Sequence, residues 1–450
     1  MNSILIQLEH LVASASDFVW PIFLPFILLV GAFTAIRTLF IVKKEATEES
    51  KLNIKNIIGP ASISLGAMIG MGSIIGVLGA LSKYSASGEV KVESIAIWAL
   101  IGSCIMVPVS YAETLNSKIM KKTPKEYIGE FMSPKLGFIY AICFVALTSF
   151  GYSGFQFSGI NSVSAIISGN IGIELTQIQR YLFIVLPLIG LVAALVLSKK
   201  HEIFMNAMTY MIGTAVLAYF TFFIIFVTKT AHYIPTYISN IFEGMLNPIN
   251  GFSGMMLGFV LGMQKIILAA ETGLGALAMA AQEADTKPRE AALISLIPTL
   301  VTVFVAIIIT SYMASYGLNE VHTINFAGSN EVQRLTQLFA TAKHVTGVFG
   351  EFVLSMFTVL SALTTILGAY YYMNKLFKKN SINKNITIYL TLIIISGTLA
   401  VFGANVLFEA VDLLLFVLCG LNVTALAIFT IKKWKYYKLC SNLKGSKQSA

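Results

Sequence analysis

Long apolar stretches follow one another along almost the entire chain, and short polar stretches separate them. Eleven of the apolar stretches contain about 20 residues or more, the length that an α-helix needs to cross the hydrocarbon core of a bilayer. The pattern therefore predicts an all-α integral membrane protein with eleven transmembrane helices. These predicted helices cover residues 18–42, 59–82, 93–117, 137–168, 178–198, 203–228, 251–283, 291–316, 347–374, 385–403 and 406–431.

The second predicted helix contains glycines where it would cross the middle of the bilayer. Its central stretch, Ser64–Ala80, reads SLGAMIGMGSIIGVLGA and includes Gly70, Gly72 and the polar Ser73. A glycine inside a helix costs about 1 kcal/mol relative to alanine, and hydrocarbon cannot satisfy the backbone groups of a loosened helix. We expect an interrupted helix covered by protein or a watery cavity; the alternative is a continuous helix whose glycines allow close packing.

The seventh predicted helix, 251–283, contains a second interruption. Gly262, Gly273 and Gly275 surround Glu271, whose carboxylate is costly at membrane depth unless it is paired or hydrated. Without the first helix, ten helices remain in two groups of five, and each group begins with an interrupted helix. The two groups enter the bilayer from opposite sides, and such a pairing in inverted repeats indicates the binding site of a transporter.

The predicted organisation is a single membrane transport domain that covers residues 1–450. Its parts are an extra helix at 18–42, a first repeat at 59–228, a second repeat at 251–431 and a basic tail at 432–450.

The composition and the charge distribution support a membrane location. Of the 450 residues, 56% are hydrophobic and only 12% are charged, whereas soluble domains carry about 25% charged residues. A net charge of +9 could indicate nucleic acid, but 23 of the 31 Lys and Arg residues lie in alternate loops and the tail. This asymmetry follows the positive-inside rule. It predicts a multi-pass protein of the inner cell membrane, with the N-terminus outside, the C-terminus in the cytoplasm and no nucleic-acid partner.

Other function classes find little support in the sequence. The four cysteines are scattered and predict neither a disulfide nor a metal site, and the five histidines receive no role. A membrane-embedded enzyme would need clustered carboxylates or a His, Asp and Ser group at one membrane face. A channel would need a repeated filter motif or a charged ring. We therefore expect a transporter rather than an enzyme; a lipid-modifying transferase is the alternative from another class.

The first interruption offers a site for an anion. A half-helix that begins near Ser73 would direct its N-terminal amides and dipole at a substrate carboxylate, and Ser73 can also cap it. Gly70 and Gly72 would let the substrate approach the backbone; the alternative is that both glycines are packing notches. Gln156 and Asn161 in the fourth helix are expected either to line this pocket or to join helices by hydrogen bonds.

Hydroxyl groups in the ninth helix offer a site for sodium. Thr364 and Thr365 could supply hard oxygen ligands opposite backbone carbonyls at Ala67 and Gly70 in the interrupted second helix. The alternative is that both threonines bond back to their own helix.

The charged residues inside or near the predicted helices allow several roles. Glu271 could contact a substrate ammonium, hold the interruption open or carry a coupling proton, and Lys265 could reach it if the chain bends. For Glu113, an interfacial carboxylate that reaches water is the default expectation and a gate residue is the alternative. Glu409 and Asp412 are expected to be hydrated ends of the last helix.

The stretch GMQKIILAAETGLGALAMAAQEADTKPREAALIS at 262–295 resembles the alanine/glycine:cation symporter family, the sodium:alanine symporters of the amino acid–polyamine–cation superfamily. The family's Gly-x-x-Arg/Lys, Ser-Asn-Glu-Ala-Gly-Leu-Gly and Thr-x-x-Pro pattern is matched by Gly262, Lys265, Glu271, Gly273, Leu274, Gly275, Thr286 and Pro288. The stretch GAMIGMGSIIGVLGA resembles the family's Gly-x-Gly-Asn-Ile-x-Gly-Val motif, and partial matches occur at 111–113, 154–164 and 363–372. The resemblance extends over about 57–376.

This resemblance implies a leucine-transporter-like core of two inverted five-helix repeats. It also implies sodium-coupled uptake of a small neutral amino acid, with sodium as the coupling ion and no other cofactor. Three departures fall in or beside the expected pocket: Ser73 replaces asparagine, Ala269 and Ala270 replace Ser-Asn, and Ala369 replaces tryptophan. The expected substrate-binding residues are Gly70, Gly72, Ser73, Gln156, Ala269, Ala270, Glu271, Thr272 and Ala369. Because of the departures, the alternative is a transporter that is coupled to protons or that carries another small zwitterion.

Overall fold

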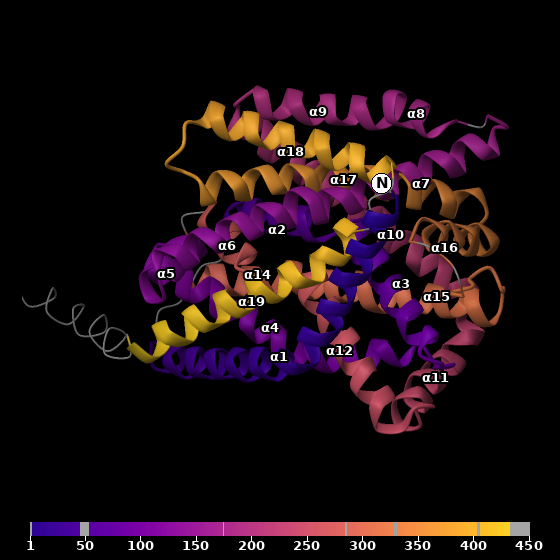
Figure 1. Cartoon of the computed structure of the whole chain (residues 1–450), viewed down its shortest axis with the longest axis horizontal. Coiled ribbons are helices and arrows are strands. Elements are labelled where there is room, and N and C mark those ends of the chain that lie inside the picture. The colour runs from indigo at the N-terminus through magenta and orange to yellow at the C-terminus, as the bar shows by residue number, and fades with distance from the viewer. Residues whose placement is uncertain are drawn as a thin grey trace, which may run out of the picture.

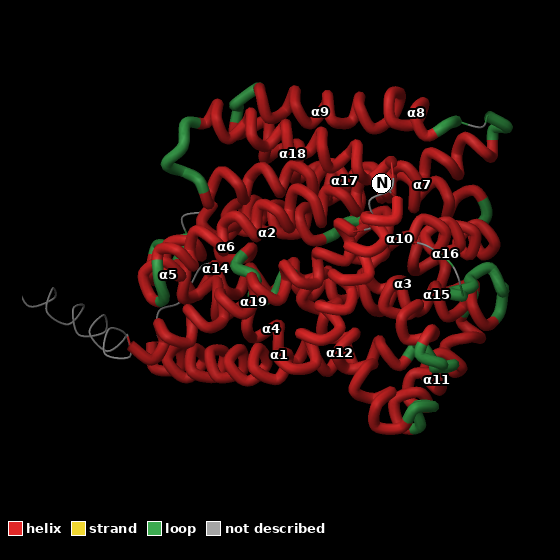
Figure 2. The backbone as a smooth tube through the Cα atoms, in the orientation of Figure 1, coloured by secondary structure: helices red, strands yellow, loops and turns green. Residues whose placement is uncertain are grey.

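The computed structural model describes residues 2–45, 54–173, 175–283, 286–327, 329, 331–402 and 406–432. All regular elements among these residues are helical (Figures 1 and 2). Ten helices are long and apolar enough to cross a membrane, and one bent pair of helices raises the number to eleven. The prediction of an all-α membrane protein with eleven spans is confirmed. The predicted basic tail lies, after Lys432, outside the described residues.

The first part of the chain forms the extra helix and five spans. Its elements are α1 (Asn2–Glu45), α2 (Ile54–Met68), α3 (Met71–Ala86), α4 (Ser94–Met120), α5 (Pro124–Phe131), α6 (Pro134–Ala146), η1 (Leu147–Tyr152), α7 (Ser153–Asn170), α8 (Gln177–Arg180), η2 (Tyr181–Val185), α9 (Leu186–Leu197) and α10 (His201–Lys229).

The second part begins with two short elements, η3 (Ala231–Tyr233) and α11 (Ile234–Leu246), that precede its five spans. The remaining elements are α12 (Gly251–Ala270), α13 (Ala276–Ala280), η4 (Ala281–Glu283), α14 (Pro288–Val303), η5 (Phe304–Ile309), α15 (Thr310–Asn319), α16 (Glu331–Thr346), α17 (Val348–Leu376), α18 (Ile382–Phe402) and α19 (Val406–Lys432).

Both predicted interruptions are present as broken helices. The second span bends by 42° between α2 and α3. In the seventh span the long helix ends at Ala270, and the short α13 starts at Ala276, after five intervening residues. Between them Glu271, Gly273 and Gly275 take positive φ angles of 48°, 76° and 91°. Glycine adopts this left-handed conformation freely, whereas Glu271 does so at a cost that the surrounding structure must offset.

The extra helix α1 packs along α19, the last span (Figure 1). The Trp20 indole donates a hydrogen bond of 3.0 Å to the backbone oxygen of Asp412, near one end of α19. Near the other end, Arg37 donates one of 3.1 Å to the backbone oxygen of Thr430. The extra helix thus holds α19 at two points about one membrane thickness apart.

The fourth span contains one widened turn. The π-helical η1 joins α6 to α7, and the three elements form one candidate span from Pro134 to Asn170. The segment α6 packs on α5 and α19, whereas α7 packs on α17, α18 and α3. A π turn accommodates one residue more than an α turn. The two halves of the span therefore present different faces to the bundle.

Candidate functional site

The break in the second span places the start of α3 inside the protein, where the Gln156 side chain of α7 contacts it. Gly70 is the residue before the helix and has extended backbone angles. The Met71 amide donates to Gln156 Oε1 at 3.0 Å. The Ser73 hydroxyl donates to the Gly70 carbonyl at 2.7 Å and makes no capping bond to an amide. The half-helix therefore begins at Met71, and the expectation that Ser73 caps it is wrong because Gln156 supplies the acceptor.

Two glycines make this contact between α3 and α7 possible. A Cβ added at Gly70 would lie 2.3 Å from Gln156 Nε2, and one at Gly72 would lie 3.2 Å from the Phe155 ring. Gln156 is only 2% exposed. The structure thus brings Gly70, Gly72, Ser73 and Gln156 together at one end of α3.

The end of α2 lies against the ninth span, α17. Thr365 Oγ1 donates to the Gly66 carbonyl at 3.0 Å, and a Cβ at Gly368 would lie 2.9 Å from that of Ala67. Thr364 Oγ1 instead donates to the Ser361 carbonyl of its own helix at 3.0 Å. The expected sodium-binding residues Ala67, Thr364 and Thr365 are therefore neighbours, while the carbonyl of Gly70 is already engaged by Ser73.

The break in the seventh span is fully enclosed. Ala269, Ala270, Glu271 and Thr272 are at most 2% exposed. Glu271 Oε2 accepts a hydrogen bond of 3.4 Å from the Tyr372 hydroxyl of α17. Within the described part of the chain, Glu271 Oε1 and Thr272 Oγ1 have no hydrogen-bond partner. A buried polar atom without a partner is costly, so these two oxygens are candidates for contact with a ligand.

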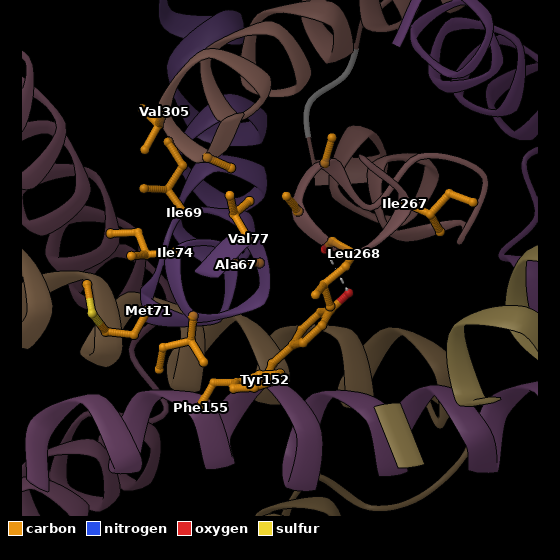
Figure 3. Close-up of a cluster of buried hydrophobic side chains, with 14 of the residues drawn as sticks. Ala67, Ile69, Met71, Ile74, Val77, Tyr152, Phe155, Ile267, Leu268 and Val305 are labelled. Carbon is orange, nitrogen blue, oxygen red and sulfur yellow. Dashed lines mark hydrogen bonds between the residues drawn. The ribbon is translucent and has the colours of Figure 1, made fainter. Parts of the chain in front are cut away.

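The helices α3 and α12, which flank the two breaks, pack against each other (Figure 3). Leu268, two residues before the end of α12, would lie 2.8 Å from a Cβ at Gly76 of α3. Tyr152 of the fourth span extends toward α12 and donates to the Leu268 carbonyl at 3.5 Å. Ala369 is buried in α17 between Gly368, which meets α2, and Tyr372, which meets Glu271.

Glu113 belongs to this site rather than to the membrane surface. Its side chain is fully buried, so the expectation of a carboxylate that reaches interfacial water is wrong. Glu113 Oε2 accepts hydrogen bonds from the Gly275 amide at 3.2 Å and from Asn422 Nδ2 at 3.1 Å. Asn422 Nδ2 also donates to the Gly273 carbonyl at 2.8 Å, and the Tyr140 hydroxyl donates to the Leu274 carbonyl. Side chains from α4, α6 and α19 therefore hold the unwound segment 271–275.

A cavity of about 230 Å³ lies between α3 and α12, beside the helical segments that flank the two breaks. Its walls include Gly76, Phe155 and Leu268, together with an ion pair of 3.5 Å between Lys265 of α12 and Asp412 of α19. The two side chains of this pair are 11% and 9% exposed. Among the described residues Lys265 thus pairs with Asp412 rather than with Glu271, and Asp412 is not the hydrated helix end that was expected. The Glu409 side chain lies outside the described residues.

Lys265→Met is expected to destabilise the protein by about 3–5 kcal/mol, because it leaves the Asp412 carboxylate buried without its cation. Lys265→Met/Asp412→Leu should recover most of this loss, since no charge then remains. The measurement is the Tm of the purified protein. Lys122→Met, which breaks the exposed pair with Glu130, serves as control and should change the stability by at most about 1 kcal/mol. Equal Tm values for Lys265→Met and the wild type would contradict the importance of the pair.

Two broken helices that face each other inside an eleven-span bundle define a membrane transporter and not an enzyme. A family model, described as the sodium:alanine symporter family, matches residues 5–449, and the chain belongs to this family. The protein is accordingly a sodium-coupled symporter. No curated protein matches the chain.

A solved structure has the same fold. It is described as the substrate-bound outward-open state of a Na+-coupled sialic acid symporter, and it is 11% identical to this chain. The similarity covers 91% of this chain and 85% of that one, with a TM-score of 0.55. The predicted fold class and the family resemblance are confirmed.

Proposed function

We propose that this symporter carries a small neutral amino acid into the cell across the inner membrane, with its N-terminus outside and its C-terminus in the cytoplasm. The observation that carries the proposal is the buried N-terminus of α3, whose amides point into the protein interior, together with the enclosed break between α12 and α13. A zwitterion needs donors at one end and acceptors at the other, and the two breaks supply one of each. The alternation of Lys- and Arg-rich loops supports the orientation.

The substrate carboxylate binds at the start of α3. Gly72 is the second residue of that helix, where an amide has no carbonyl partner within the helix, and the helix dipole favours an anion there. Gln156 contributes its Nε2 group, which lies beside Gly70. Ser73 completes this end of the pocket through the hydroxyl that now bonds to the Gly70 carbonyl.

The substrate ammonium binds at the other break, where Glu271 Oε1 and Thr272 Oγ1 are buried oxygens without partners in the described residues. Ala269, Ala270 and Ala369 provide small walls, which leave room for a side chain. Sodium binds between α2 and α17, where carbonyl groups near Ala67 and Gly70 and the hydroxyls of Thr364 and Thr365 are hard oxygen donors. Binding of the ion stabilises the end of α2 and thereby the start of α3.

Uptake of labelled alanine and glycine into proteoliposomes, with and without an inward sodium gradient, tests the proposal. We expect uptake that requires sodium and that Glu271→Gln reduces at least tenfold, because the amide cannot neutralise the ammonium. Glu320→Gln, at an exposed position directly after α15, is the matched control and should transport normally. Uptake that is independent of sodium, is driven by a pH gradient and disappears in Glu271→Gln would instead support proton coupling. The buried Glu271, which forms no ion pair among the described residues, also allows this.

A further inference from the structure

A second cavity, of about 200 Å³, lies at the ends of α9, α10, α17 and α18 that join lysine-rich loops. These ends lie on the same side of the bundle as the last turn of α19 (Figure 1). The basic residues that line the cavity are Lys199, Lys200, His201 and Lys375. The proposed transport cycle does not use this cavity.

Among the described residues, Glu283 is the one carboxylate in the lining of this cavity, and it is already paired. Its Oε1 lies 2.5 Å from His201 Nε2, and its Oε2 lies 3.3 Å from Lys375 Nζ. The Tyr371 hydroxyl donates to the same Oε2 at 2.9 Å. The charge of Glu283 is therefore satisfied inside the cluster and does not offset the remaining cations.

Lys199 and Lys200 are those remaining cations. Neither forms an ion pair with a carboxylate in the described part of the chain, and both line the cavity. They directly precede α10, a helix of 29 residues whose first turn has no side-chain cap. The positive end of this helix adds to the potential of the two lysines, although the exposed Glu202 in its first turn reduces that effect. The cavity is therefore suited to an anion.

The other wall of the cavity is apolar and continues onto the outer surface of the bundle. Leu195, Val196, Phe204 and Ile382 belong to the lining. Ile382 is 50% exposed, and the adjacent Leu197 is 54% exposed on the surface that faces the lipid. A small water-soluble anion would leave this wall unused, whereas a molecule with a phosphate and hydrocarbon chains would contact both walls.

We propose that this cavity binds the phosphate group of an anionic phospholipid from the leaflet on the lysine-rich side. The phosphate lies between Lys199, Lys200 and the start of α10, and the first carbons of the acyl chains lie against Leu195 and Ile382. Basic pockets between transmembrane helices are a known physical solution for holding lipid head groups.

The test measures binding to the purified, delipidated full chain by native mass spectrometry and by thermal shift. The probes are short-chain phosphatidylglycerol, phosphatidylcholine with the same chains, and inorganic phosphate. We expect phosphatidylglycerol to bind most tightly of the three probes. The variant Lys199→Gln/Lys200→Gln should weaken this binding about thirtyfold, because each lysine contributes about 1 kcal/mol to the attraction of an anionic lipid. Both lysines are exposed, so the variant should fold, and its unliganded Tm verifies this.

The matched control is Lys379→Gln/Lys384→Gln, which removes two exposed charges from the same face but outside the cavity. Its affinity for phosphatidylglycerol should stay within twofold of the wild type. An equal loss of affinity in both variants would overturn the proposal, because it would mean that the lipid is attracted to the basic surface in general and not to this cavity. A thermal shift by inorganic phosphate as large as that by phosphatidylglycerol would also overturn it in favour of a soluble anion. Neither readout requires transport, so the result is independent of the proposed substrate.

Discussion

Gly70→Ala is expected to reduce sodium-driven uptake about a hundredfold while the protein still folds into the membrane. The new Cβ would lie 2.3 Å from Gln156 Nε2, so the Gln156 side chain must leave the Met71 amide. Overpacking costs about 1–3 kcal/mol, and an unsatisfied buried amide costs about as much again. A hundredfold loss corresponds to about 2.7 kcal/mol, which lies within this range. The measurement is the initial rate of uptake per amount of reconstituted protein.

Gly79→Ala provides the control for this experiment. Gly79 lies in the same helix, and a Cβ added there meets nothing within 4 Å. Its uptake should therefore match the wild type. If Gly70→Ala/Gln156→Ala, which removes the clash, regains thermal stability but not uptake, the defect lies in the donors at the start of α3. Normal uptake by Gly70→Ala would show that this break is not part of the substrate site.

Asn422→Leu is expected to destabilise the protein by about 2–5 kcal/mol and to reduce uptake more than tenfold. The amide Nδ2 group bonds to both Glu113 Oε2 and the Gly273 carbonyl, and Asn422 Oδ1 accepts from the Tyr127 hydroxyl. Leucine has the same branched shape and number of heavy atoms, and it leaves each of the three groups buried with one hydrogen-bond partner fewer. Each such loss costs about 1–3 kcal/mol. The Tm and the uptake rate are measured together.

The control is Asn383→Leu, the same substitution at an exposed position of α18. It should leave the Tm and the uptake rate unchanged. A double-mutant cycle with Glu113→Gln isolates the contact between the two side chains, because their separate effects should not add. Additive effects would contradict the view that Glu113 and Asn422 hold the unwound segment as a unit.

The broken helices could be predicted from the sequence because their cause is local. Gly70, Gly273 and Gly275 interrupt apolar stretches, and both breaks occur where these glycines lie. The eleven spans followed from length and hydropathy alone. The Gln156 side chain lies at the start of α3, and the pocket-lining role expected for it from the sequence stays a prediction.

The partners of the charged residues could not be predicted in the same way. Asp412 and Lys265 are far apart in the sequence, as are Asn422 and Glu113, and only the packing of α19 against α12 and α4 brings them together. A polar Asn422 inside an otherwise apolar span was the one available signal. It indicates an interhelical hydrogen bond but does not identify the partner.

The widened turn η1 determines which way Gln156 points. Each residue of an α-helix advances the azimuth by about 100°, so the additional residue in Leu147–Tyr152 rotates everything after it relative to a regular helix. Without that rotation, α6 could keep its contacts with α19, but the Gln156 amide would point away from Met71. Deletion of one residue from Leu147–Tyr152 would therefore turn the Gln156 side chain away from the start of α3, although every residue of the pocket would still be present.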